Sequence, residues 1–313
     1  MKKLATVLAI ILSVSLAPAI AADKPKVAVV VKTLTGDIFQ LKMAEAARDH
    51  AISLGAEAEI YQAGGHTAVQ KMVQIIEDVI VKGVDIIVIS PLDAKSVVPA
   101  FQLAKEEGVI VVCMDQVADG DDYLTYVATD NYAAAKIGAD FAKKILNGKG
   151  KVMIIEGAPG SSTAIARRDG FGENVVKDSE ITIAASQSGY WQNDKAMEAT
   201  QNVLQANPDV DLIFCSSDVM VGGVVEAVKL AGKEGAIKII SFDGSSFGIN
   251  LVKDGRITAD VGQFPVKIGQ LSVQTAYDVY TGKTEAASIP RFLDSGTQLI
   301  TQDNAAEALK DVF

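Results

Sequence analysis

The residues of this sequence best suited to chemistry stand where its short apolar runs end. Lys32 follows the run that starts at Val27, and Asp115 follows the run over 109–113. Asp243 likewise follows the run over 237–242. The full candidate set combines charged groups, amides, a hydroxyl and aromatic rings: Lys32, Phe39, Asp115, Gln116, Arg167, Trp191, Ser217, Asp243 and Gln263.

This chemistry suits a neutral ligand that carries many hydroxyl groups. Each sugar hydroxyl donates one hydrogen bond and accepts others, so Asp115 and Asp243 could accept while Lys32 and Arg167 donate. Hydrogen bonds to charged groups contribute roughly 1.5–3 kcal/mol each. The less polar faces of a sugar ring need flat apolar walls, which aromatic side chains such as Trp191 could provide. The set therefore indicates a site for a small carbohydrate.

Each candidate also has a purely structural interpretation. Asp115 and Asp243 could cap the turn or helix that follows them, and Lys32 could be an exposed charge at a strand end. Arg167 lies in a charged stretch and could be a solvated helix residue. Trp191, the only tryptophan, could belong to the core. At the level of sequence these alternatives stay open.

Metal binding and nucleophilic catalysis find no support in the residue pattern, and no cofactor is expected. The two histidines, His50 and His66, and the two cysteines, Cys113 and Cys215, form no spaced ligand set. Gly244–Gly248 matches the G-x-S-x-G pattern, but that chemistry needs a histidine after the serine, and both histidines lie upstream. Both histidines are expected in solvent. The cysteines are expected to be buried free thiols, with a disulfide as the alternative.

Continuous apolar runs predict the strands that must position the candidate residues. Runs such as Asp85–Ile89 lack polar alternation, which is typical of strands covered on both faces in parallel sheets. Between the runs, residues such as Val69, Met72, Val73 and Ile76 fall on one face of a helix. The predicted strands span 26–31, 57–61, 84–90, 109–113, 151–156, 181–187, 210–215 and 237–242.

Strand–helix alternation at this spacing predicts an α/β protein with doubly wound parallel sheets. The alternation breaks between Tyr123 and Asn131, which lead into a predicted helix over 132–146, and Gly148 restarts the strand series. Two similar lobes with a cleft between them follow. In such sheets ligands bind beyond the carboxyl ends of the strands, where the candidate residues stand.

The first 21 residues have the pattern of a secretory leader. Lys2 and Lys3 precede an apolar run over 4–16, and Ala19-Ile20-Ala21 forms a cleavage site, with cleavage expected after Ala21. The run is too short for a bilayer, which takes about 20 residues. The mature chain is therefore expected to be exported.

The mature chain is expected to be acidic. Cleavage removes two lysines and leaves 27 of the 29 basic residues against 39 acidic ones, a net charge of −12. A nucleic-acid partner needs clustered Lys and Arg, and the sequence has no basic run. Nucleic acid is thus excluded as a partner.

Several short segments occur in an order and spacing that carry a family resemblance. They are Val27-Ala-Val-Val-Val-Lys-Thr-Leu, Asp130-Asn131, Ala166-Arg-Arg-Asp-Gly-Phe, Ala185-Ser-Gln, Asn207-Pro-Asp, Ser241-Phe-Asp-Gly and Val261-Gly-Gln-Phe-Pro. Taken in order, they make the chain similar to the periplasmic sugar-binding proteins of the ribose, allose and galactose type (periplasmic binding protein type I). The resemblance implies two lobes joined by a three-segment hinge, with crossings near 129, 264 and 290. The N-terminal lobe would comprise 22–129 plus 264–290, and the C-terminal lobe 130–263 plus 291–313.

The resemblance also implies roles for the candidate residues. Lys32 matches the allose-like members, which carry lysine where the ribose-like members carry serine. Gln116 stands in place of an arginine, and Ser217 in place of an asparagine. These differences favour a hexose-like sugar or a polyol over ribose. By position, the polar sugar ligands would be Asp115, Arg167, Asp243 and Gln263, and the ring-facing aromatics Phe39 and Trp191.

In function, the resemblance implies the solute-binding component of an ABC-type sugar importer, which is not an enzyme. It would be a periplasmic monomer that captures a monosaccharide or polyol by closure of its lobes. Its partner would be the ABC permease of the inner membrane, and a chemotaxis receptor is a further partner that the resemblance allows. The alternative is an exported carbohydrate-processing enzyme that uses the carboxyl groups of Asp115 and Asp243 from opposite lobes.

Overall fold

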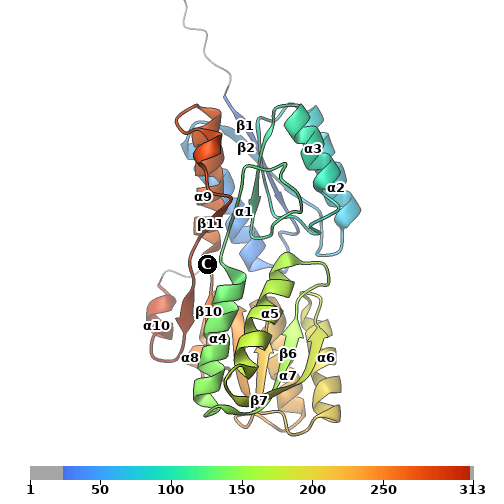
Figure 1. Ribbon diagram of the computed structural model, residues 1–313, viewed down its shortest axis with the longest axis vertical. Helices are drawn as coiled ribbons and strands as arrows, with labels where there is room; N and C mark the ends of the chain where they lie inside the picture. The colour runs from blue at the N-terminus through green and yellow to red at the C-terminus, as the bar shows by residue number, and fades with distance from the viewer. Residues whose placement is uncertain (1–23, 311–313) are drawn as a thin grey trace, which may run out of the picture.

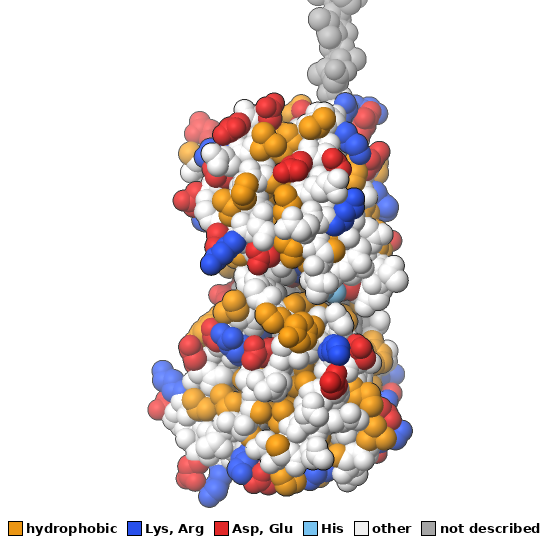
Figure 2. Space-filling model, turned by 90° about the vertical axis from the view of Figure 1, so that its right-hand side faces the viewer, with side chains coloured by type: hydrophobic (Ala, Val, Ile, Leu, Met, Phe, Trp, Pro, Cys, Tyr) orange, Lys and Arg blue, Asp and Glu red, His pale blue; other side chains and the backbone are white. Residues whose placement is uncertain are grey.

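The computed structural model describes residues 24–310, and the predicted leader over 1–21 lies outside this range. Two lobes are stacked along the long axis of the molecule, each built around one six-stranded sheet (Figure 1). Within the described range, no helix combines the length and the apolar character needed to cross a membrane. Figure 2 shows a narrow waist where the lobes meet, with acidic and basic side chains interspersed over both lobes.

The first lobe has a sheet that is parallel throughout, in the order β11-β5-β4-β3-β1-β2. Its strands are β1 (Lys26–Val31), β2 (Glu57–Gln62), β3 (Ile86–Ile89), β4 (Ile110–Met114), β5 (Thr125–Ala128) and β11 (Phe292–Asp294). Its helices are α1 (Ile38–Ser53), α2 (Val69–Val81), α3 (Val98–Glu106) and α9 (Pro265–Tyr280), followed by the 3-10 helix η1 (Ala286–Ser288).

Both faces of this sheet are covered, which accounts for the unbroken apolar sequence of β1. Val27 and Val29 pack in the core shared with α1 and α9. Ala28 and Val30 pack in the core shared with α2 and α3. Because successive strand residues point to opposite faces, every residue of such a strand must be apolar.

The second lobe repeats this plan in the order β12-β10-β9-β8-β6-β7, with β12 antiparallel to β10. Its strands are β6 (Lys149–Glu156), β7 (Glu180–Ser188), β8 (Leu212–Cys215), β9 (Lys238–Asp243), β10 (Ala259–Gly262) and β12 (Gln298–Ile300). Its helices are α4 (Asn131–Ile145), α5 (Ser162–Val176), α6 (Asn193–Ala206), α7 (Asp218–Leu230), α8 (Ser246–Lys253) and α10 (Ala305–Ala308). Val152 and Ile154 of β6 face α4 and α5, while Met153 and Ile155 face the core on the other side.

The described chain passes between the two sheets at three places: after β5, after β10 and after β11. The third crossing, expected near 290, comes later. Phe292–Asp294 pairs in parallel with Tyr126–Ala128, so the chain stays in the first lobe through Asp294. The assignment of 291–313 to the second lobe is therefore wrong for this strand, because β11 completes the edge of the first sheet beside β5.

The search for continuous apolar runs does not predict four of the strands: β5, β10, β11 and β12. They have three or four residues each, and each contains a polar residue, so none of them forms a continuous apolar run. β5 lies within the segment 123–131 that the sequence pattern marks only as a break. The predicted helix over 132–146 matches α4 closely.

Candidate functional site

The facing ends of the two lobes enclose a cavity that both lobes line. Its walls are formed by the residues that follow the strands and by the first turns of helices, as expected for the carboxyl ends of parallel sheets. A second cavity of about 360 Å³ adjoins it and shares Asp37 and Asp243. The first cavity is lined by Lys32, Asp37, Phe39, Gln40, His66 and Asp115 of the first lobe, and by Thr163, Arg167, Trp191, Ser217, Val219 and Asp243 of the second.

Asp115 is the centre of the polar network in the first lobe. It follows β4 with a φ of 65°, a left-handed conformation that costs a non-glycine residue roughly 1–3 kcal/mol. Its Oδ2 accepts hydrogen bonds from Lys32 Nζ at 2.7 Å, Gln40 Nε2 at 2.9 Å and Ser90 Oγ at 2.9 Å. Burial alone would raise the pKa of Asp115, but the charge and hydrogen bond of Lys32, together with the charge of Arg167 and the hydrogen bond of Ser90, lower it. Asp115 is therefore an ionised acceptor, and within the described chain its Oδ1 receives no donor.

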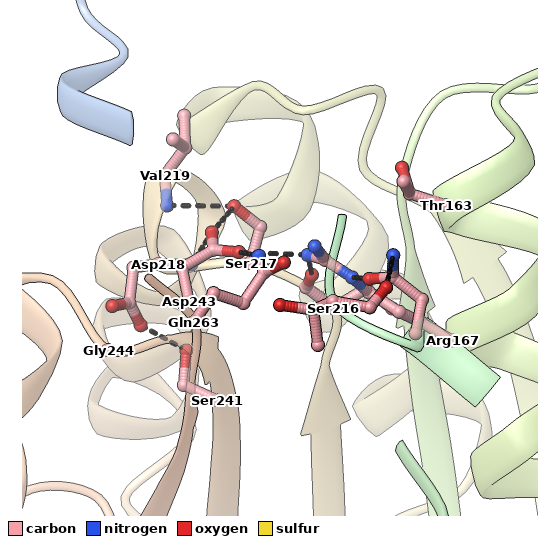
Figure 3. A network of polar contacts seen from close by, with 12 residues as sticks. Thr163, Arg167, Ser216, Ser217, Asp218, Val219, Ser241, Asp243, Gly244 and Gln263 are labelled. Carbon is pink, nitrogen blue, oxygen red and sulfur yellow. Dashed lines mark hydrogen bonds and ion pairs between the residues drawn. The ribbon is translucent and has the colours of Figure 1, made fainter. Parts of the chain in front are cut away.

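Asp243 is the centre of the network in the second lobe (Figure 3). It ends β9 with a φ of 118°. Its Oδ1 accepts from Arg167 Nη1 at 2.9 Å and Gln263 Nε2 at 2.7 Å. Its Oδ2 accepts from Ser217 Oγ at 2.7 Å and from the backbone N–H of Asp218 at 3.3 Å. Burial, reinforced by the negative charge of Asp218, raises the pKa of Asp243 to about 7 although the charge of Arg167 opposes this.

Arg167 reaches from α5 into the cavity and is fixed on several sides. Its Nε donates to Asn131 Oδ1 at 2.8 Å. Its Nη1 donates to the carbonyl of Ser216 at 2.7 Å as well as to the carboxylate of Asp243. The guanidinium carbon lies 3.9 Å from the ring centre of Phe242 and 5.7 Å from that of Trp191, in cation–π contact. Its Nη2 has no bonding partner in the described chain, which leaves a charged donor at the cavity.

Two buried aromatic residues form the apolar walls. Phe39 lies in the first turn of α1, and Trp191 precedes α6 with a φ of 57°. The indole lies directly against Gly157, where a Cβ atom would come within 1.9 Å of the ring. Glycine is therefore required at 157 for the indole to take this position.

Two further carboxyl groups lie behind Asp243. Asp218 accepts from Ser245 Oγ at 2.7 Å, while Asp260 is fully buried and its Oδ2 has no hydrogen-bond partner. Both carboxyls converge over Gly248, where a Cβ atom would lie 2.2 Å from Asp218 and 2.4 Å from Asp260. Burial raises the pKa of both groups, and for Asp260 the charge of Asp218 raises it further.

The structure brings most of the predicted residues to this cavity and sets two apart. Gln263 lies behind Asp243, to which it donates, and its own Oε1 is buried without a partner. Gln116 is buried after β4 but does not line the cavity. Lys32 and Arg167 are only 4% and 3% exposed, so neither is a solvated surface charge. The predicted residues that line the cavity are Lys32, Phe39, Asp115, Arg167, Trp191, Ser217 and Asp243.

Several residues that hold the charged groups were absent from the predicted set. Ser90 and Ser216 directly follow β3 and β8, so the criterion that selected the other candidates could have found them. Asn131 opens α4 beside the first crossing. Gln40 lies in the first turn of α1, where its N–H donates to Asp37 Oδ1 at 3.1 Å.

The expectation that His66 lies in solvent is wrong. Its side chain is 13% exposed, lines the cavity and places Nε2 3.2 Å from Asp37 Oδ2. The physical reason is its position after β2. Loops that follow the strands of a parallel sheet all gather at the same edge, so this loop faces the cleft as the others do.

The cysteines behave as the sequence indicates. Cys113 and Cys215 are buried free thiols at the ends of β4 and β8. Burial raises the pKa of Cys113 to about 12 and that of Cys215 still further, so neither is a reactive thiolate. Among residues 24–310, no group of three or more His, Cys, Asp or Glu side chains is arranged to hold a metal ion.

Two doubly wound lobes, three crossings and charged networks on facing strand ends define a two-lobed solute-binding protein. Residues 27–284 match the family model described as "Periplasmic binding protein domain", and the chain belongs to this family. The resemblance seen in the sequence and the predicted fold class are thereby confirmed.

Named relatives and solved structures agree with this family. The chain is 31% identical over 290 residues to the ribose import binding protein RbsB of Salmonella typhimurium, covering 93% of this chain and 96% of that protein. It is 34% identical over 259 residues to the D-allose-binding periplasmic protein of Escherichia coli, covering 80% and 83%. Its fold is similar to an ABC transporter periplasmic solute binding protein from Actinobacillus succinogenes with bound D-allose. That match has a TM-score of 0.84 at 28% identity and covers 91% of this chain and 100% of the other.

Proposed function

We propose that this chain is the sugar-binding component of an ABC-type importer and that it captures a hexose-like sugar or a polyol between its lobes. The relatives are named for ribose and D-allose, and the solved relative holds D-allose. The observation that carries the proposal is the pair of buried networks around Asp115 and Asp243, one on each lobe, at a single cavity. A ligand that contacts both networks must be small and polar.

The two buried ion pairs of the cavity favour a neutral ligand. Asp115 is paired with Lys32 at 2.7 Å, and Asp243 with Arg167 at 2.9 Å, so each of these two acids already has its own cation. Neither an anion nor a cation would find an uncompensated partner in these pairs. Hydroxyl groups fit better, since they can donate to one member of a pair and accept from the other.

Specific atoms are available to such hydroxyls. Oδ1 of Asp115 can accept a hydroxyl hydrogen, and Nη2 of Arg167 can donate to a hydroxyl oxygen. The ammonium of Lys32 has three hydrogens and one described partner, so it can donate as well. Each such bond to a charged group contributes roughly 1.5–3 kcal/mol. The faces of the ring would then lie against Trp191 and Phe39.

The preference for a hexose or polyol over ribose rests on the sequence differences within this site. Lys32 is characteristic of the allose-like members of the family. Ser217 replaces an asparagine of the ribose-like members, and it lies in the cavity wall bonded to Asp243. Both substitutions change the hydrogen-bonding partners that a ribose would meet.

Capture would work by closure of the lobes. A ligand that bonds to Asp115 on one lobe and Arg167 on the other gains its full set of contacts only when the lobes are together, so it stabilises the closed state. The three crossing segments would act as the hinge. The closed form would then be presented to the importer permease, with the protein in the periplasm. Since the relative from Salmonella typhimurium is named as an import binding protein, release of unchanged sugar is expected, not turnover.

Isothermal titration calorimetry on the chain from Ala22 onward tests the proposal. The panel would contain D-allose, D-glucose, D-galactose, D-ribose, D-xylose and the hexitols. We expect saturable binding of one sugar per chain, tightest for a hexose or hexitol. Absence of saturable binding to every member would refute sugar capture, whereas tightest binding of ribose would refute only the hexose preference. Chemical conversion of the sugar would support the enzyme alternative.

A further inference from the structure

One polar side chain of the cavity wall is anchored on one side and unsatisfied on the other. His66 places Nε2 3.2 Å from Asp37 Oδ2, and its Nδ1 is buried without any partner. Its loop is tied to the site, because the N–H groups of Gly64 and Gly65 donate to the carbonyl of Lys32 at 2.9 and 3.0 Å. His66 is thus fastened directly beside the charged network of the first lobe.

The orientation of the imidazole is fixed by Asp37. One oxygen of that carboxylate accepts the N–H of Gln40 at 3.1 Å at the start of α1, and the other holds His66. In the tautomer that carries its hydrogen on Nε2, the nitrogen next to Asp37, the ring presents Nδ1 as a bare acceptor. A buried polar atom without a partner costs roughly 1–3 kcal/mol. A hydroxyl that donates to Nδ1 would remove this cost.

We propose that His66 is a ligand-contacting residue that determines specificity, accepting a hydrogen bond at Nδ1 from a hydroxyl of a six-carbon sugar or polyol. This inference rests on the proposed function and names a contact within the same cavity. The networks around Asp115 and Asp243 offer partners to the ring hydroxyls that pentoses and hexoses share. His66 adds one acceptor on the first lobe, and a hexose in its pyranose form has one more hydroxyl than the corresponding pentose, on its hydroxymethyl group.

The chain itself supplies a matched control. His50 is the only other histidine in the sequence. It lies on α1 and bonds to Gln274 of α9 at 2.9 Å, away from the cavity wall. Two histidines give two sets of ring signals in a ¹H–¹³C NMR spectrum, and a His50→Asn variant assigns them. Titration with the tightest-binding hexose should shift the ring signals of His66 and leave those of His50 in place.

Calorimetry with a matched pair of sugars tests the specificity. D-Allose and D-ribose in their pyranose forms differ by the hydroxymethyl group; if another hexose binds tighter, its own pentose counterpart is used. His66→Ala should weaken hexose binding at least about tenfold and pentose binding less than about twofold. His66→Asn, which offers an amide oxygen near the position of Nδ1, should recover part of the loss.

The outcomes separate this inference from the proposed function. If sugar changes the fluorescence of Trp191 but leaves the His66 signals unmoved, sugar binding stands and the His66 contact is overturned. Equal losses for hexose and pentose in His66→Ala would overturn it too, since they would indicate a general disturbance of the first lobe. If the wild-type protein binds no sugar at all, the proposed function fails and this inference fails with it.

Discussion

The pairing of Arg167 with Asp243 leads to a prediction about stability as well as binding. Replacing Arg167 by methionine keeps most of the side-chain volume but removes the cation. The carboxyl group of Asp243 would then lie buried beside Asp218 without the cation that opposes the rise of its pKa, so it must either stay ionised without a partner or take up a proton to remain folded. Adding Asp243→Asn to the same chain removes the stranded charge. We therefore expect the double variant to be more stable than the Arg167→Met single variant.

The magnitude follows from the burial of the pair. The two side chains are only 4% and 8% exposed, so this ion pair belongs to the buried class. Removing one partner of a buried pair typically costs about 3–5 kcal/mol, whereas removing both can be nearly neutral. Arg167→Met also loses the bonds to Asn131 and Ser216, so we expect the upper part of that range. The second substitution should restore at least about 1 kcal/mol. Both variants should lose sugar binding, because a charged donor on the second lobe is gone.

Urea unfolding of the ligand-free protein at about pH 8 or above, where Asp243 with its pKa of about 7 is ionised in the wild type, measures these differences by circular dichroism. Arg168→Met is the matched control, since its side chain is 39% exposed and its ion pairs with Asp169 and Glu156 lie at the surface. Loss of an exposed pair should change stability by less than about 1 kcal/mol. Either of two results would refute this prediction. Arg167→Met could prove as stable as the Arg168→Met control, or the double variant could lose as much free energy of unfolding as the Arg167→Met and Asp243→Asn single variants lose together.

Three further predictions concern other parts of the site. Asp260→Asn should stabilise the protein by about 1–3 kcal/mol near pH 8, because an amide can donate to Asp218 without first taking up a proton, as the buried carboxyl group must. The folded-state pKa of Asp260 is raised, so its contribution to stability is present below the ordinary pKa of about 3.9 and is lost as the pH rises towards the folded value. Urea unfolding at a series of pH values should show that the free energy of unfolding falls as the pH rises in the wild type and falls less steeply in Asp260→Asn. Equal slopes in the two proteins would contradict this prediction. Gly157→Ala should displace Trp191 and weaken sugar binding at least about tenfold in calorimetry, while Gly172→Ala, whose Cβ meets only ordinary contacts at 3.4 Å, should not. Sugar binding should persist well below pH 5, because the pKa of Asp115 is lowered and its acceptor is lost only as the pH falls through that value; a loss of binding at constant fold as the pH falls through about 7 would follow protonation of Asp243 and would contradict this prediction.

The sequence predicts the larger elements of this fold because their signals are strong. β1 and β3 are covered by helices on both faces, so their apolar runs are unbroken and easily recognised. β11 pairs at the sheet edge through three residues, of which Phe292 is exposed, and such a strand is specified by its partner β5 more than by its own sequence. This is why the third crossing could not be placed correctly from the residue pattern.

The candidate site was predictable to the extent that one geometric rule applied. Residues that follow parallel strands meet at one edge, and this rule alone selects Lys32, Asp115 and Asp243. It also covers Ser90, which was not among the candidates, and His66, which was expected in solvent. The rule cannot reveal which of these side chains contact one another. The convergence of Asp218 and Asp260 over a glycine depends on contacts between α7, α8 and β10, and no local pattern encodes these.

A crystal structure of the complex with the tightest-binding sugar would show whether the ligand bridges the two lobes. We expect one sugar molecule between the lobes, within hydrogen-bonding distance of Asp115 on one side and of Arg167 or Asp243 on the other, with its ring against Trp191. A sugar that contacts one lobe alone, or that lies away from these residues, would contradict it.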